Sequence, residues 1–138
     1  MLWLNPFRIN YIFKKPSRNK VLLYDGVTKE HMNLLVKKYT IFYNRYEEIN
    51  LYVLFYTILK DGLKEIKKNY KINFFKFVSP KLIITFIDIN LGFYKLKDIY
   101  SSCKYLSIEF LTKKNLKTSK DNKLISTDFV SLLGKNSV

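Results

Sequence analysis

Short runs of apolar residues recur along the chain, and they predict strands that are buried on both faces. Residues 21–24 and 82–87 are continuously apolar or β-branched, a pattern typical of the inner strands of a parallel sheet. Residues 39–43, 105–110 and 126–133 predict three further strands. We expect 21–24 and 82–87 to be the central strands.

The segments between these runs have the length, caps or apolar positions of helices. We expect helices at residues 28–38, 51–59, 72–78 and 91–100. Residues 51–59 are apolar almost all round, which predicts a helix that is buried. Three polar segments are expected to form a turn, a solvated lysine-rich stretch and a loop, at residues 44–50, 63–71 and 112–123. The alternation of strands and helices predicts an α/β fold with a doubly wound, mostly parallel, Rossmann-like sheet.

The first 19 residues differ from the rest and predict a leader arm, followed by a single α/β domain over residues 20–138. The arm holds several aromatic residues and ends in cations, Lys14, Lys15 and Arg18. It is expected to pack on the domain or to fray, although aromatics followed by cations could also contact an anionic membrane surface. The longest apolar stretch, residues 49–59, is much shorter than the roughly 20 residues that a membrane-spanning helix needs. These features predict a cytoplasmic protein, at most peripheral to the inner membrane.

The formal net charge of +14 raises the possibility of a nucleic-acid partner. However, 22 of the 25 basic residues are lysine, and they are spread along the chain. Proteins that recognise nucleic acid use arginine for forked contacts to guanine and phosphate, and lysine is a poorer substitute. The abundance of Lys, Asn, Ile, Tyr and Phe is what an AT-rich genome imposes through its codons. We therefore expect no specific nucleic-acid binding.

Cofactor and metal chemistry find little support in the sequence. The single Cys103 and the single His31 allow neither a disulfide within the chain nor a zinc site of the usual spacing. No glycine-rich phosphate loop follows any predicted strand; Gly26, after the first one, is expected only to permit a sharp turn. We expect no metal and no cofactor in this chain.

Polar residues at strand ends are the candidate site. Asp25 follows the first strand, and Asp88 with Asn90 follows the apolar run at 82–87. Ligands of open α/β sheets bind outside the carboxyl ends of the strands, so these side chains could accept sugar hydroxyls; they could equally cap the next helix. Arg45, Glu48 and Asn50 form a second polar cluster. In it, Arg45 contacts a ligand's carboxylate or phosphate, or pairs with Glu47 or Glu48.

Several strings resemble bacterial surface carbohydrate (lipopolysaccharide) biosynthesis proteins. They are Lys20-Val-Leu-Leu-Tyr-Asp25, Arg45-Tyr-Glu-Glu-Ile-Asn50 and Pro80-Lys-Leu-Ile-Ile-Thr-Phe-Ile-Asp88-Ile-Asn90, with Phe93-Tyr-Lys-Leu96 and Lys104-Tyr-Leu-Ser-Ile108. The resemblance covers about residues 20–134, and the string at 80–90 is the most specific. After Ile108, Glu109-Phe-Leu111 stands where the family has a polar segment.

The resemblance implies glycosyltransferases with two Rossmann-like domains (a GT-B-like architecture), of which this chain would be the amino-terminal, acceptor-side half of an incomplete enzyme. It implies a saccharide or lipid-linked acceptor, with Asp25, Arg45, Glu48, Asp88 and Asn90 as acceptor-binding candidates and no catalytic residue assigned. A sugar nucleotide is expected only with a second domain. The alternatives are a basic binding module for nucleic acid or an anionic membrane, and a remnant that folds without function.

Overall fold

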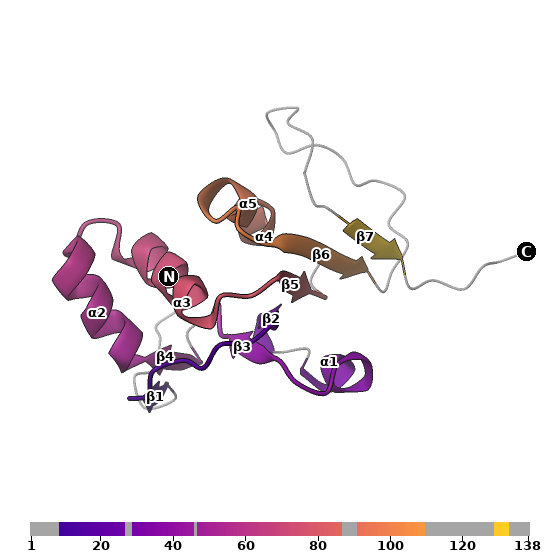
Figure 1. The fold of residues 1–138 in the computed structure, drawn as a ribbon, viewed down its shortest axis with the longest axis horizontal. Helices are drawn as coiled ribbons and strands as arrows, with labels where there is room; N and C mark the ends of the chain where they lie inside the picture. Colours follow the sequence, from indigo (N-terminus) through magenta and orange to yellow (C-terminus); the bar gives the residue numbers. More distant parts are fainter. Residues whose placement is uncertain (1–8, 27–28, 46, 87–90, 110–128, 133–138) are drawn as a thin grey trace, which may run out of the picture.

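The computed structural model describes residues 9–26, 29–45, 47–86, 91–109 and 129–132. Among these, five parallel strands form one sheet in the order β3-β2-β5-β6-β7 (Figure 1). Their bounds are β2 (Val21–Tyr24), β3 (Thr40–Phe42), β5 (Leu82–Thr85), β6 (Lys104–Glu109) and β7 (Phe129–Leu132). This confirms the predicted parallel α/β sheet with residues 21–24 and most of 82–87 as adjacent inner strands.

The order of these strands reverses at β2. Taken along the chain, the order is 2-1-3-4-5, one of the two common orders of doubly wound sheets and different from the 3-2-1-4-5-6 order of dinucleotide-binding domains. The chain goes from β2 outward to β3 and then returns to place β5 on the other side of β2. The carboxyl ends of β2 and β5 therefore form the point where ligands of such sheets bind.

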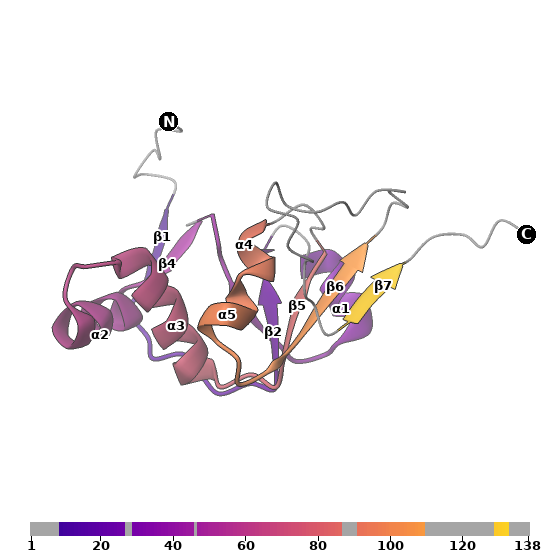
Figure 2. The same cartoon turned by 90° about the horizontal axis from the view of Figure 1, so that it is seen from above.

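Helices cover both faces of the sheet (Figures 1 and 2). They are α1 (Lys29–Leu35), α2 (Leu51–Asp61), α3 (Ile66–Val78), α4 (Leu91–Tyr94) and α5 (Leu96–Ile99). On one face, Met32 of α1 packs with Leu23 and Ile84. On the other face, α3, α4 and α5 pack on the sheet, and α2 lies outside α3. Strand residues alternate between the two cores, since Leu22 and Ile83 face α3 while Leu23 and Ile84 face α1.

The larger core is built around aromatic rings. The ring of Phe42 lies 5.7 Å from that of Tyr24, 5.1 Å from that of Phe74 and 5.3 Å from that of Phe75, measured between centroids. Such pairs contribute roughly 0.5–1.5 kcal/mol each beyond the area they bury. Phe93 continues the cluster, with its centroid 5.6 Å from that of Tyr24. These contacts fasten α3 and α4 to the ends of β2 and β3.

Helix α3 is longer than its sequence suggested. It begins at Ile66 and not at residue 72. The prediction that residues 63–71 are solvated holds for Lys67 and Lys68, which are exposed, and is wrong for Tyr70, which is buried. Tyr70, Phe74 and Val78 are buried at spacings of four residues, which places them on one helical face. The lysines between them disguise this apolar stripe in the sequence.

Helix α2 is not buried, contrary to the prediction for residues 51–59. Val53 and Thr57 are its buried residues, whereas Phe55 is 53% exposed and Leu59 is 88% exposed. The reason is that α2 packs on α3 along a single stripe and has no other helix or sheet on its outer side among the described residues. The apolar composition of residues 51–59 predicted a buried helix, but the burial of α2 depends on how many other elements pack around it.

Part of the predicted polar turn at residues 44–50 is a strand. β4 (Glu48–Asn50) pairs in parallel with β1 (Asn10–Ile12), which comes from the leader, so the prediction is wrong for residues 48–50. The predicted helix at 91–100 is divided into α4 and α5 at Lys95. No helix among the described parts of the chain is long and apolar enough to cross a membrane.

Asn50 joins the leader to the helices. Its side-chain oxygen accepts a hydrogen bond from the backbone N–H of Val53 (3.1 Å) and caps α2, while its side-chain nitrogen donates to the Lys14 carbonyl (2.8 Å). Its backbone N–H donates to the Tyr70 hydroxyl of α3 (2.9 Å). One residue therefore connects the leader, α2 and α3.

We predict that Asn50→Ala lowers the free energy of unfolding by about 1–2 kcal/mol, because the cap and the bond to the leader are lost together. Urea unfolding followed by circular dichroism measures this change. The control is Asn69→Ala, whose side chain donates to the Lys64 carbonyl at the surface, and it should change stability by less than about 0.5 kcal/mol. Equal effects of the two substitutions would contradict the proposed connection.

Candidate functional site

The end of β2 is occupied by a buried carboxylate in an unusual backbone conformation. Asp25 is fully buried, its φ is 92°, and its backbone N–H donates to the Phe42 carbonyl (2.9 Å). Two other described non-glycine residues have a positive φ, Glu65 and Ser79, and both cap α3. Asp25 is the one of these three that directly follows a strand. Such conformations are uncommon and concentrate at functional sites.

Gly26 is needed for close packing at the end of β2, whereas the turn predicted there continues into residues 27 and 28, which lie outside the described residues. A Cβ atom added at Gly26 would lie 2.3 Å from Cε1 of Tyr43, well inside van der Waals contact. The unusual φ belongs to Asp25 instead. The glycine thus lets the Tyr43 ring approach the backbone at the end of β2.

Arg45 pairs with Asp25. Nε of Arg45 lies 3.2 Å from Oδ2 of Asp25, and the arginine side chain is 58% exposed while the carboxylate is fully buried. A buried carboxylate is costly unless a cation or hydrogen bonds compensate it, so Arg45 stabilises Asp25 from the solvent side. The structure brings together these two predicted site residues, and Arg45 pairs with Asp25 rather than with Glu47 or Glu48.

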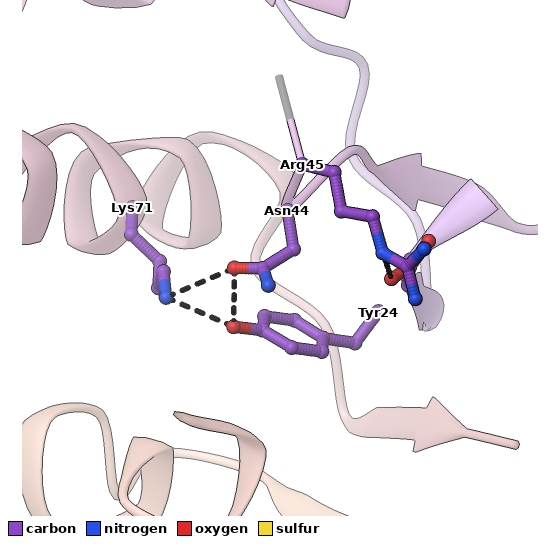
Figure 3. A network of polar contacts seen from close by, with 5 residues as sticks. Tyr24, Asn44, Arg45 and Lys71 are labelled. Atoms are coloured by element: carbon purple, nitrogen blue, oxygen red, sulfur yellow. Dashed lines mark hydrogen bonds and ion pairs between the residues drawn. The ribbon is translucent and has the colours of Figure 1, made fainter. Parts of the chain in front are cut away.

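Beside this pair lies a network of three side chains, Tyr24, Asn44 and Lys71 (Figure 3). The Tyr24 hydroxyl donates to Oδ1 of Asn44 (2.6 Å), and Nζ of Lys71 donates to the Tyr24 oxygen (2.9 Å) and to Oδ1 of Asn44 (3.3 Å). Tyr24 is the last residue of β2, Asn44 follows β3, and Lys71 comes from α3. Three elements that are far apart in the sequence meet at the carboxyl edge.

Lys71 is held without a carboxylate partner in the part of the chain that the structure describes. Its Nζ lies 5.2 Å from the ring centre of Tyr24 and 5.9 Å from that of Phe42, within the range of cation–π attraction. Burial lowers the pKa of Lys71, because desolvation disfavours the charged ammonium. Two of its three N–H donors are used by the network, and a ligand could take the third.

Lys71, Asn44 and Tyr24 were not among the site residues predicted from the sequence. Lys71 lies three, four and seven residues before Phe74, Phe75 and Val78, which is the spacing of one helical face. A lysine in this apolar stripe was the available signal, but residues 63–71 were expected to be solvated. Tyr24 was taken only as a core residue, which its ring is, while its hydroxyl belongs to the network.

Glu48 lies in β4 and is not part of the Asp25–Arg45 pair. Its Oε2 accepts a hydrogen bond from Nδ2 of Asn10 (3.3 Å). Burial raises the pKa of the Glu48 carboxyl, and the bond from Asn10 opposes this change. The pKa of the Tyr43 hydroxyl is raised first by burial and then by the negative charges of Glu48 and Glu47.

Two predicted site residues, Asp88 and Asn90, lie outside the described residues. Within the described part, no three His, Cys, Asp or Glu side chains are grouped to hold a metal ion. The described groups at the carboxyl edge are therefore two cations, one amide, one phenol and one buried carboxylate. This set offers hydrogen bonds to hydroxyl groups and positive charge to an anionic substituent.

Comparison of the chain with protein-family models, with curated proteins and with solved structures finds no match in any of the three.

We predict that Gly26→Ala lowers the free energy of unfolding by about 1–3 kcal/mol, because the new methyl group collides with the Tyr43 ring. In a Tyr43→Ala background the same substitution should cost less, since the colliding ring is gone. Urea unfolding of the four proteins gives the interaction energy, which we expect to exceed about 0.5 kcal/mol. Strictly additive effects would show that the two residues are not in contact.

We predict that the pKa of Lys71 in the folded protein lies below the ordinary lysine value of about 10.4. An NMR titration of the lysine side chains measures it, and the resonance absent from Lys71→Met assigns it. Between the lowered pKa and about 10.4 the unfolded chain binds more protons, so the contribution of Lys71 to stability rises with pH in that window. Lys71→Met should remove this rise; an unchanged pH dependence would contradict the prediction.

Proposed function

We propose that this chain is the amino-terminal, acceptor-binding domain of a glycosyltransferase for surface polysaccharide or lipopolysaccharide, acting on the cytoplasmic side of the membrane. One observation carries the proposal: the Arg45–Asp25 pair and the Tyr24–Asn44–Lys71 network adjoin at the carboxyl end of β2. That end lies at the reversal of strand order, where ligands of doubly wound sheets bind.

The chemistry of this edge suits a saccharide. Asn44 combines a donor and an acceptor in one amide, and Tyr24 adds a phenolic hydroxyl, which are groups that exchange hydrogen bonds with sugar hydroxyls. Lys71 and Arg45 add positive charge, which suits the phosphate of a lipid-linked acceptor. In this proposal Asp25 does not contact the acceptor, because it is fully buried; it positions Arg45.

Residues that follow β5 and residues of β4 have further proposed roles. Asp88 and Asn90 follow β5, the strand beside β2, and would add acceptor contacts there. Glu48, in β4, is a further candidate for contact with the acceptor. No catalytic residue is assigned, and a sugar nucleotide would be held by a second domain supplied by more of the same chain or by another chain.

We predict that the domain binds a phosphorylated sugar at this edge. The test is an amide NMR titration of the protein with glucose 1-phosphate, with glucose and inorganic phosphate titrated separately. Glucose 1-phosphate should shift the resonances of residues 44, 45 and 71. Glucose alone and inorganic phosphate alone should each bind more weakly than glucose 1-phosphate. Lys71→Met should weaken binding about tenfold, the usual effect of losing a hydrogen bond to a charged group.

The matched control is Lys68→Met on the same helix, three residues earlier. Lys68 is paired with Glu65 at the surface (3.4 Å), so its loss should leave affinity unchanged. Asp88→Asn tests the expected contribution of the chain after β5. Shifts scattered over the exposed lysines, or equal losses from Lys68→Met and Lys71→Met, would show nonspecific charge attraction and would refute the proposal.

A further inference from the structure

The outer side of α2 is a strongly exposed apolar surface. We define the α2 face as Phe13 from the leader with Phe55, Tyr56, Leu59 and Leu63. Phe13, Leu59 and Leu63 are 70%, 88% and 73% exposed. Figures 1 and 2 show α2 at the edge of the molecule, with α3 between it and the sheet. Large exposed apolar patches of this kind mark interaction sites.

Contacts with neighbouring residues hold the α2 face in place. The ring of Phe13 lies 6.3 Å from those of both Tyr52 and Phe55, in edge-on contacts, so the leader and the helix form one continuous patch. The bond from Asn50 to the Lys14 carbonyl and the pairing of β1 with β4 hold the leader in this place. Little conformational freedom would therefore be lost when the face binds.

An apolar cavity of about 90 Å³ lies between β4, α2 and α3. It is lined by Ile49, Leu54, Ile66, Lys67 and Tyr70. Leu54 borders it from α2, Ile49 from β4, and Ile66, Lys67 and Tyr70 from α3.

The charges around the α2 face are predominantly positive. Six exposed lysines come from the leader and from residues 60–68, namely Lys14, Lys15, Lys60, Lys64, Lys67 and Lys68. The two acids of the same region are already engaged, since Asp61 accepts a hydrogen bond from Asn73 (2.7 Å) and Glu65 pairs with Lys68. Nζ of Lys60 lies 5.3 Å from the Tyr56 ring centre, so this lysine extends across an aromatic ring of the face.

We propose that the α2 face binds an anionic phospholipid surface, with α2 lying in the plane of the membrane. Phe13, Phe55 and Leu59 enter the boundary between headgroups and acyl chains, and the lysines contact the headgroups. An apolar helix face bordered by lysines and aromatic rings is the pattern of interfacial helices. A helix of 11 residues suits this orientation, because a span needs about 20.

Charge complementarity favours a membrane over a second copy of the chain. A symmetric dimer through the α2 face would place two lysine rims opposite each other, which opposes association. An anionic lipid surface attracts the same lysines. The proposal is independent of the acceptor site, because it uses none of the residues of that site.

Sedimentation of the whole chain with vesicles tests the proposal, using phosphatidylcholine alone and phosphatidylcholine with phosphatidylglycerol. Binding should require phosphatidylglycerol and weaken with added salt. Phe55→Ser combined with Leu59→Ser should reduce partitioning about tenfold or more. The matched control is Leu34→Ser with Leu35→Ser, two exposed leucines of α1 on the opposite side of the sheet (84% and 57% exposed), which should leave partitioning unchanged.

A second pair of variants tests the lysines. Lys60→Gln with Lys64→Gln should weaken binding about fivefold for each lysine removed, whereas Lys37→Gln with Lys38→Gln, after α1, should not. If both lysine pairs, or both apolar pairs, reduced vesicle binding equally, the proposal would be overturned. The binding would then be nonspecific electrostatic or hydrophobic adsorption. Absence of vesicle binding would overturn the proposal as well. If the chain instead self-associates, and Phe55→Ser with Leu59→Ser abolishes the self-association, the α2 face binds a second copy of the chain.

Discussion

The burial of β2 on both faces and both edges is the constraint on which the rest of the structure depends. Its backbone pairs with β3 and β5, and its side chains alternate between the core under α1 and the core under α3. A strand in this position cannot leave polar groups unpaired along its length, so polar chemistry is confined to its end. Asp25, in a positive-φ conformation at this end, is compensated by Arg45.

Tyr24 shows how the core and the candidate site are built from the same side chain. Its ring is buried and packs against Phe42 and Phe93, whereas its hydroxyl bonds Asn44 and Lys71 at the carboxyl edge. The aromatic cluster thereby fixes the position of the polar network. Lys71 depends on the same rings, since their burial of its ammonium lowers its pKa while cation–π attraction offsets part of the cost.

A second organising contact is the attachment of the leader through Asn50. The cap of α2, the bond to Lys14 and the bond from the backbone to Tyr70 make the leader, α2 and α3 one unit. The exposed apolar residues Phe55 and Leu59 of this unit belong to α2, which lies on the far side of α3 from the sheet (Figures 1 and 2). The protein therefore presents two separate surfaces, a polar one at the end of the sheet and an apolar, lysine-bordered one on α2.

The sequence alone determined the parallel sheet and its inner strands, because continuous apolar runs such as residues 21–24 have no stable place except between two layers. It also indicated Asp25 and Arg45, since a strand end is a local feature. Only the tertiary structure decided that Arg45 pairs with Asp25, that Lys71 joins Tyr24 and Asn44, and that α2 is exposed. Those outcomes depend on which elements become neighbours: Lys71 is 47 positions from Tyr24. Helix α2 packs on α3, β1 and β4 and leaves Phe55 and Leu59 exposed. Local composition does not determine which residues distant in sequence come into contact. The packing of the helices on the sheet determines it.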